Sequence, residues 1–215
     1  MQDAAKISSM RVAVGGTSPS HTSTRILEVA ERLAQTRGFN GFSYADIAAE
    51  LGITKASLHY HFASKSDLGR SLIVRYGDRF AAAFRTLGDS QTQLRRYVQL
   101  YEDVLVRDRM CLCGMLAAEY STLPSAMQRE LRRFFNRNET WLAKSLERGR
   151  IEGKLRFEGS ALEAAGALTA GLEGAMLLAR SYGEPARFAA TATRLLSELG
   201  ITPSPVSRKT ASTFS

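Results

Sequence analysis

The sequence predicts an all-α protein of about nine helices, in which a small N-terminal domain of three helices precedes a larger helical domain. Three observations support this prediction. Apolar residues recur at helical spacing along most of the chain. All five prolines lie at expected helix ends or in the tails, where they interrupt no helix. No segment has a convincing strand pattern.

The first two helices have clear boundaries. Apolar residues at helical spacing over 26–34 give the first helix one buried face, and Gly38 is placed to end it. Ser43 and Asp46 have the spacing of a capping box, which predicts the start of a second helix. Gly52 allows the sharp turn after that helix, because a positive φ costs glycine little.

The third helix is short and follows this turn directly. Thr54 is a suitable N-cap for a helix that runs to His61, and Leu58 is placed to pack back onto the second helix. Ser64 and Asp67 then form another capping-box pattern, which opens a fourth helix. Two short helices joined by a tight turn at this spacing predict a helix-turn-helix that binds duplex DNA, with the third helix in the major groove.

The chemistry of the third helix predicts how DNA would be contacted. Lysine reaches guanine edges and an alanine methyl meets thymine, so one end of the helix is suited to reading bases. Thr54 caps that end, and the residues expected near base edges are Lys55, Ala56, Ser57 and His59. The residues expected to hold phosphates are Ser43, Tyr60, His61 and Lys65.

This segment resembles the N-terminal domain of TetR-type (TetR/AcrR) transcriptional regulators. The resemblance is carried by Phe39–Ala48, Gly52–Leu58, Tyr60–Phe62 and Lys65–Leu68, and His59 departs from it because many relatives carry tyrosine there. The resemblance implies dimerisation through the last two helices, a palindromic operator and a small-molecule effector. It favours repression, which is the commoner mode of the family.

Charge and composition narrow the class of protein but do not locate the site. The net charge of +8 suits an anionic partner. Residues 1–88 carry 11 Lys and Arg against 7 Asp and Glu, and residues 89–215 carry 18 against 14, so both parts have the same excess of +4. There is no run of 18 apolar residues and no signal-peptide pattern, and two cysteines make no disulfide framework. We therefore expect a cytoplasmic protein without a membrane span.

Four regions are expected along the chain. Residues 1–20 read as a flexible arm, in which Arg11 could enter a minor groove, although a disordered tail is the favoured interpretation. Residues 21–68 form the helix-turn-helix domain, and residues 69–202 form the effector-binding and dimerisation domain. Residues 203–215 read as a disordered tail.

The larger domain is expected to contain six helices. Their expected ranges are Lys65–Leu87, Gln91–Arg109, Cys113–Leu123, Ser125–Ile151, Ser160–Tyr182 and Pro185–Leu199. Small residues four apart in 166–175 let helix backbones approach closely. The resemblance places a four-helix dimer interface on the last two helices, and the alternative is a tightly packed internal helix.

An effector pocket would need an apolar lining with a few polar anchors. Taken one at a time, the candidate residues are more typical of ordinary core packing. The candidates are Tyr97, Tyr101, Met110, Cys111, Met115, Tyr120, Phe134, Trp141, Leu172 and Met176.

The stretch Cys111–Glu119 is also similar to sequences found at this place in some TetR-type regulators, certain of which sense electrophiles or oxidants through a cysteine. Arg107 and Arg109 could lower the pKa of a thiol of Cys111 or Cys113, which makes both candidate sensor residues. On a helix the two thiols would point apart and form no disulfide with each other. The alternative is a pair of buried, inert thiols. Two cysteines are too few for a zinc site, so no metal or other cofactor is expected.

These patterns predict a ligand-responsive transcriptional regulator. The alternative is a ligand-independent or architectural DNA-binding protein, whose larger domain serves only for assembly. An enzyme is disfavoured because the sequence has no P-loop, dinucleotide glycine motif, HExxH or nucleophile elbow, and no histidine beyond His61.

Overall fold

The computed structural model describes residues 19–83 and 88–202, and every regular element within these ranges is helical. The all-α prediction is therefore confirmed. The expected flexible arm up to residue 18, with Arg11, and the expected tail at 203–215 lie outside the described residues. The described elements are α1 Pro19–Arg37, α2 Tyr44–Leu51, α3 Lys55–His61, α4 Lys65–Ala82, α5 Ser90–Leu105, α6 Leu112–Ala118, the 3-10 turn η1 Tyr120–Thr122, α7 Ser125–Ile151, α8 Ala161–Tyr182 and α9 Pro185–Glu198.

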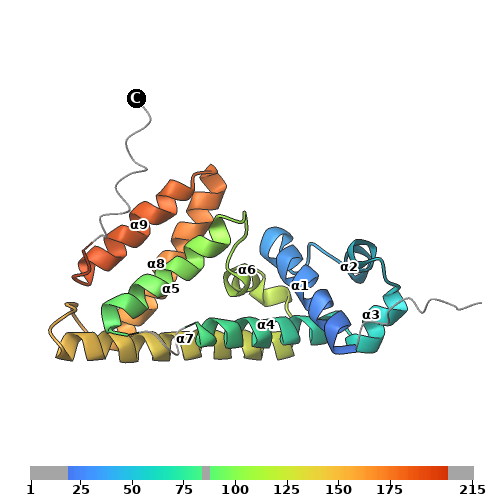
Figure 1. Ribbon diagram of the computed structural model, residues 1–215, viewed down its shortest axis with the longest axis horizontal. Coiled ribbons are helices and arrows are strands. Elements are labelled where there is room, and N and C mark those ends of the chain that lie inside the picture. Colours follow the sequence, from blue (N-terminus) through green and yellow to red (C-terminus); the bar gives the residue numbers. More distant parts are fainter. Residues whose placement is uncertain (1–18, 84–87, 203–215) are drawn as a thin grey trace, which may run out of the picture.

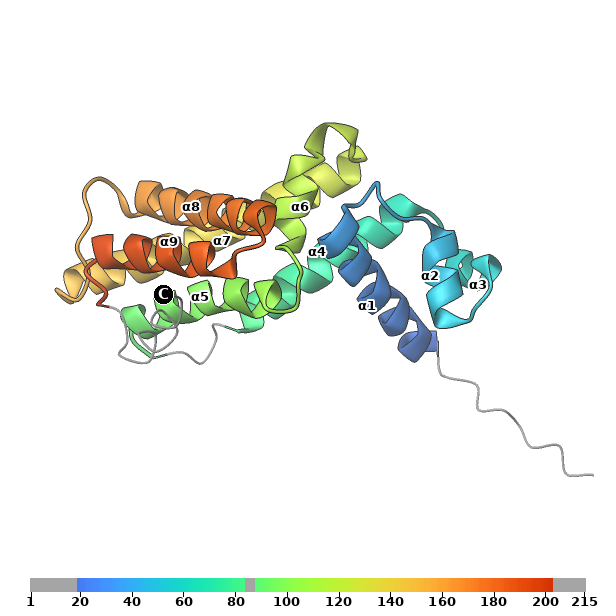
Figure 2. The same cartoon turned by 90° about the horizontal axis from the view of Figure 1, so that it is seen from above.

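The helices form a small head and a larger body that are joined along α4 (Figure 1). Helices α1, α2 and α3 gather at one end of α4, where they make the head. Helices α4 and α7 lie side by side, and α5, α8 and α9 pack together at the other end of the molecule. Seen from above, α6 lies between this bundle and the head (Figure 2). Helix α4 therefore belongs to both parts, and a shift of α4 moves the head.

Local sequence signals set the helix boundaries of the head. The Ser43 N–H donates to Asp46 Oδ2 at 2.8 Å, as expected for the capping box at the start of α2. Gly52 ends α2 with φ 64°, in the left-handed region that glycine adopts freely. Thr54 Oγ1 accepts the Ser57 N–H at 3.2 Å and so caps α3. The turn between α2 and α3 is therefore encoded locally.

Two expected helices in the body are shorter than the sequence pattern suggested. Helix α5 ends at Leu105 rather than Arg109, because the chain turns at Asp108, where φ is 53°. The expected helix Cys113–Leu123 is split into α6 and η1 at Glu119, whose carboxylate is bound to the head. Helix α4 ends at Ala82 with Ala83 as its C-cap, and the rest of its expected range, residues 84–87, lies outside the described ranges.

The core of the body is built from aromatic rings on three helices. Phe80 of α4 packs edge-on against Tyr97 of α5 and Phe134 of α7, with ring centroids 5.5 and 5.7 Å apart. Between α8 and α9, a Cβ on Gly171 would lie 2.9 Å from Leu195 Cδ1, so this glycine permits the close approach of the two helices. Small residues in α8 thus contribute to packing within the chain.

Helix α8 is long and apolar enough to cross a membrane by length and composition, with a mean hydropathy of 1.3 over its most apolar 18 residues. It contacts both α7 and α9, and the side chains buried by those contacts include Leu168, Leu172 and Met176. This is the arrangement of a helix in a packed bundle. Its opposite face remains exposed.

Candidate DNA-binding face and effector domain

Helix α3 presents a polar face to solvent and is anchored by one apolar side chain. Leu58 is fully buried, whereas Lys55, Ala56 and His59 are exposed. Tyr60 is 79 % exposed, which is unusual for so large a ring and leaves its hydroxyl free to reach a partner. Four of the expected DNA contacts, Lys55, Ala56, His59 and Tyr60, are therefore exposed on α3, whereas Ser57 and His61 are half-buried.

Tyr44 of α2 holds this face in place, a role that the sequence analysis did not assign. Its hydroxyl donates to the Phe62 carbonyl oxygen at 2.9 Å, and burial raises the pKa of Tyr44 to about 12. The Tyr44 ring lies 4.9 Å from the imidazole of His59, and His59 Nδ1 lies 3.2 Å from the Ala63 carbonyl oxygen. These contacts fix His59 at the edge of α3.

A shallow hollow of about 360 Å³ lies where the start of α2 meets α3. Its lining combines expected DNA contacts with the residues that support them: Phe42, Ser43, Tyr44, Ala45, Lys55, His59 and Lys65. The free N–H groups at the start of α2 also favour an anion there.

The placement of Lys65 revises the expectation that its ammonium holds a phosphate. Lys65 Nζ donates to the Phe39 carbonyl oxygen at 2.6 Å and also to the Phe42 carbonyl oxygen. It lies 4.6 and 4.5 Å from the centroids of the Phe39 and Phe42 rings. Burial lowers the pKa of Lys65, while the Glu119 carboxylate opposes that change. The side chain therefore braces the turn between α1 and α2.

Glu119, at the end of α6, connects that same turn to the body. Its carboxylate accepts the Phe39 N–H at 2.7 Å and the Asn40 N–H at 3.3 Å. A Cβ on Gly38 would collide with this carboxylate, so glycine is required both for the positive φ and for the contact. Glu119 is the last residue of the Cys111–Glu119 stretch noted in the sequence analysis. Its role could not be predicted there, because its contact with Phe39 forms only in the folded chain.

A second connection joins the end of α1 to α8. Arg180 donates to the Thr36 carbonyl oxygen at 2.8 Å and to the Gln35 carbonyl oxygen at 3.3 Å. The Met110 N–H donates to the same Gln35 oxygen at 3.2 Å. A cation at a helix C-terminus also interacts favourably with the helix dipole. The end of α1 is thus held by both α8 and Met110, and the turn after α1 is held by Glu119.

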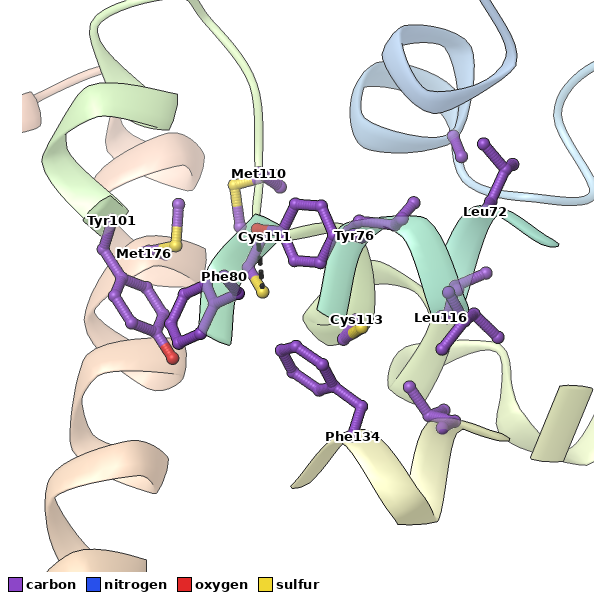
Figure 3. Close-up of a cluster of buried hydrophobic side chains, with 14 of the residues drawn as sticks. Leu72, Tyr76, Phe80, Tyr101, Met110, Cys111, Cys113, Leu116, Phe134 and Met176 are labelled. Atoms are coloured by element: carbon purple, nitrogen blue, oxygen red, sulfur yellow. Dashed lines mark hydrogen bonds between the residues drawn. The ribbon is translucent and has the colours of Figure 1, made fainter. Parts of the chain in front are cut away.

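Most of the expected pocket residues pack against one another in the body. Tyr97, Tyr101, Met110, Cys111, Phe134, Leu172 and Met176 are buried, and several of them appear in Figure 3. The Tyr97 hydroxyl lies 3.3 Å from that of Tyr101 and 3.2 Å from Thr169 Oγ1, so their polar ends are satisfied internally. These side chains form the core.

The other three expected pocket residues lie at the edges of this cluster. Met115 is half-buried, and Trp141 reaches from the Tyr97 ring to a groove on the surface. Tyr120 belongs to η1, where the Arg132 guanidinium lies 5.9 Å from its ring centroid. Seven of the ten candidates are thus buried, as the core-packing interpretation expected, and Phe134 and Trp141 also line a surface groove.

The two thiols are buried, as the alternative of inert thiols expected, and the proposed activation by nearby arginines is not seen. Cys111 and Cys113 are both free and buried, and Tyr76 donates its hydroxyl hydrogen to Cys111 Sγ at 3.7 Å (Figure 3). Burial raises the pKa of both thiols well above the usual value, and the nearby Glu173 carboxylate raises that of Cys111 further. Arg107 and Arg109 therefore do not activate these thiols in this structure, where both remain protonated.

Glu173 brings an ionisable group to the edge of the same core. Tyr101 donates its hydroxyl hydrogen to Glu173 Oε1 at 3.4 Å. Burial raises the pKa of Glu173 to about 7, and hydrogen bonds from Cys111 and Tyr101 limit the rise. A Cβ on Gly114 would collide with this carboxylate, so α6 packs closely around it.

The raised pKa of Glu173 predicts a pH-dependent stability. The folded state holds the proton more tightly than the unfolded chain, so the free energy of unfolding falls as pH rises from about 4.5 to about 7. We expect Glu173→Gln to remove this slope and to stabilise the protein above pH 7 by about 1–3 kcal/mol. Urea unfolding across this pH range measures it.

Glu163→Gln is the matched control for this experiment. The pKa of Glu163 is lowered by hydrogen bonds from Ser160, so its contribution to stability is lost at pH values below that window. An equal change of slope between pH 5 and 7 in both variants would contradict the assignment to Glu173.

The geometry of the head and body agrees with comparisons to known proteins. Residues 26–72 match the family model of bacterial regulatory proteins of the tetR family, and residues 91–195 match that of the tetracyclin repressor-like C-terminal domain. A crystal structure of a TetR-family transcriptional regulator from Agrobacterium tumefaciens is 36 % identical with a TM-score of 0.80. That match covers 85 % of this chain and 99 % of the other.

Two curated relatives differ in the direction of regulation that their names give. The transcriptional repressor DhaR of Mycobacterium sp. (strain GP1) is 28 % identical over 60 % of this chain and 65 % of its own length. The transcriptional activator FasR of Mycolicibacterium smegmatis is 27 % identical over 46 % of this chain and 48 % of its own length. The matched regions span about half to two-thirds of these relatives. With both domain models and a relative of full length in agreement, the chain belongs to the TetR family of bacterial DNA-binding transcriptional regulators.

Proposed function

We propose that this protein is a ligand-responsive repressor of the bacterial cytoplasm, which binds a palindromic operator as a dimer and is released by a small apolar or electrophilic effector. The observation that carries the proposal is the exposed face of α3, where Lys55, His59 and Tyr60 are held outward by the buried Leu58. A short helix of this kind reads the major groove while phosphate contacts fix its register.

Dimerisation is supported by the outer face of α8. Leu162, Leu177, Leu178 and Tyr182 are exposed there, which is a large apolar surface for a single helix. Pairing of α8 and α9 with the same helices of a second chain would cover it in a twofold interface, and two heads would then meet a palindrome. Light scattering should give twice the mass of one chain, and a monomer at working concentration would contradict this part of the proposal.

The two connections between head and body give the effector a route to the DNA. Glu119 and Met110, at the two ends of the α6 segment, both bind main-chain atoms of the head, and Arg180 binds them from α8. A ligand that displaces α6 or α4 would therefore turn the head relative to the dimer. It changes DNA affinity only if it binds the two arrangements with different free energies.

Replacement of Tyr60 or Lys55 should separate phosphate binding from base reading. We expect Tyr60→Ala to weaken binding to all DNA sequences by a similar factor, because Tyr60 is expected to contact the phosphate backbone of the DNA, which is the same in every sequence. Lys55→Ala should cost about 1–3 kcal/mol on the operator and relax the preference for one base. The measurement is affinity for an operator and a scrambled duplex over a salt series.

Lys154→Ala serves as the control in that experiment, because Lys154 is an exposed lysine in the loop between α7 and α8. It should leave operator affinity within the error of the wild-type value. Equal losses on operator and scrambled DNA for Lys55→Ala would contradict base reading by this residue.

The test of the whole proposal is binding to the DNA upstream of the protein's own gene, with a panel of apolar, aromatic and electrophilic compounds. Specific binding that one compound releases supports the regulator as proposed. Specific binding that no compound releases supports a ligand-independent DNA-binding protein, which the filled core around Tyr97 and Tyr101 favours as the second candidate. A lack of specific binding would contradict both.

A further inference from the structure

A groove between α4 and α7 has an unusual combination of groups, none of which takes part in the proposed DNA contacts. We call it the α4–α7 groove. Its volume is about 420 Å³, within the range of sites for small organic ligands. It is lined by Gly77 and Ala81 of α4 and by Phe134, Asn136, Arg137, Asn138, Thr140, Trp141 and Lys144 of α7.

One lining residue has an unused hydrogen-bond donor. Asn138 is only 7 % exposed, and its Nδ2 has no hydrogen-bond partner within the described ranges. Leaving a buried amide unpaired is costly, and Ser145, the other buried polar residue of α7, is satisfied. The Ser145 hydroxyl donates to Gln93 Oε1 at 2.7 Å. Because the terminal torsion of asparagine rotates over a broad range, a ligand oxygen in the groove can take up this donor.

Two basic side chains of the groove, Arg137 and Lys144, lie before and after Asn138 in α7. Arg137 and Lys144 are seven residues apart, which is about two helical turns. Lys144 forms no ion pair with any residue that the structure describes, and Arg137 meets only Asp78, at 3.4 Å in an exposed position. Exposed pairs of this kind contribute little, so both cations remain available to an anion. A carboxylate would satisfy the cations and the Asn138 amide together.

The apolar part of the groove is formed mainly by Phe134 and Trp141, and both rings are held by other aromatic rings. The Trp141 ring stacks on Tyr97 with centroids 6.1 Å apart, and Phe134 packs edge-on against Phe80. A Cβ on Gly77 would lie 3.3 Å from Phe134 Cδ2, so glycine keeps the α4 side of the groove open next to this ring. A flat aryl group or a short alkyl chain could cover these rings.

We propose that the α4–α7 groove binds a small organic carboxylate with an apolar, aryl-bearing body. Asn138, Arg137 and Lys144 hold the carboxylate, and Phe134 and Trp141 contact the body. The regulatory consequence rests on the proposed function: α4 carries the head, so a molecule seated between α4 and α7 changes how the head is held. The groove therefore defines the chemical class of the effector.

The chain provides its own reporter, because Trp141 is the single tryptophan in the sequence. We would titrate the full-length protein with 3-phenylpropanoate and follow tryptophan fluorescence. The matched neutral probe is 3-phenylpropanamide, which has the same body without the charge. We expect a saturable change with the carboxylate and at least about tenfold weaker binding of the amide. Equal binding of the two probes, or no saturable change with either, would overturn the proposal.

Variants on α7 test the individual contacts. Asn138→Leu should weaken 3-phenylpropanoate binding about tenfold, and Lys144→Gln about threefold, because each removes one partner of the carboxylate. Lys144 is exposed, so its variant tests the site even if Asn138→Leu does not fold. Arg129→Gln, on the same helix but outside the groove, should bind as the wild type does. Wild-type binding by both groove variants would also overturn the proposal.

The DNA-binding assay distinguishes failure of this proposal from failure of the proposed function. Carboxylate binding at Trp141 without any effect on operator affinity would support the site and count against its role as the effector site. Operator binding that is released by another compound, with no carboxylate-dependent fluorescence change, would overturn the site and leave the regulator intact.

Discussion

Phe80→Ala should destabilise the protein by about 3–5 kcal/mol, because it empties the centre of the aromatic core. The Phe80 ring lies 5.5 Å from Tyr97, 5.7 Å from Phe134, 6.4 Å from Tyr101 and 6.3 Å from Tyr76, all as centroid distances. Its removal leaves a cavity at the place where α4, α5 and α7 meet. Urea unfolding measures the loss, with wild type and variant at the same protein concentration because the stability of a dimer depends on concentration.

Two further variants separate ring contacts from volume. Phe80→Leu keeps most of the volume and should cost about 1–2 kcal/mol, since it loses chiefly the edge-on ring contacts. Val106→Ala, at a side chain that is 78 % exposed, should change stability by less than about 0.5 kcal/mol. A loss below about 1 kcal/mol for Phe80→Ala would show that the core closes over the space and is less rigid than we infer.

Glu119→Gln should loosen the head from the body while leaving both folded. The charged carboxylate that accepts the Phe39 and Asn40 N–H groups becomes a neutral amide, and hydrogen bonds to charged groups contribute about 1.5–3 kcal/mol each. We expect amide exchange at Phe39 and Asn40 to accelerate by about 10- to 100-fold. The same variant should lose part of the effect that any effector has on DNA affinity.

Glu147→Gln is the matched control, because Glu147 is an exposed carboxylate on α7 whose partner is Arg150. It should leave exchange in the head unchanged. Unaltered exchange at Phe39 and Asn40 in Glu119→Gln would mean that the turn is held by other contacts, such as the Lys65 ammonium on the Phe39 and Phe42 carbonyl oxygens.

The elements of the head could be predicted from sequence because their signals are local. Ser43 and Asp46 are three residues apart, and Thr54 lies at the start of the helix that it caps. Such contacts depend on few torsions and on no distant part of the chain. The prediction for Lys65 needed more than this. The placement of its ammonium on two carbonyl oxygens depends on how the α1–α2 turn packs against α4, and this arrangement is not encoded in the spacing of residues.

The larger body was harder to predict for a related reason. Helical periodicity indicates which side chains face inward, but it does not tell whether space remains between them. Tyr97 and Trp141 each lie among apolar residues at helical spacing, yet Tyr97 is fully buried and Trp141 reaches the α4–α7 groove. The protonation of the thiols also could not be predicted from neighbours in the sequence. Arg109 is close to Cys111 in sequence, while burial and Glu173 determine the protonation of that thiol.

Three of the residues that attach the head to the body share one property: Glu119, Arg180 and Met110 all bind main-chain atoms of the head. Almost any residue can supply those atoms, so the side chains of α3 can be replaced without disturbing the attachment. During evolution, the DNA sequence preference of the head can therefore change without altering how the head is attached to the body. A body of this kind should accept a foreign head, provided that the graft keeps Gly38 and the path of the turn after it.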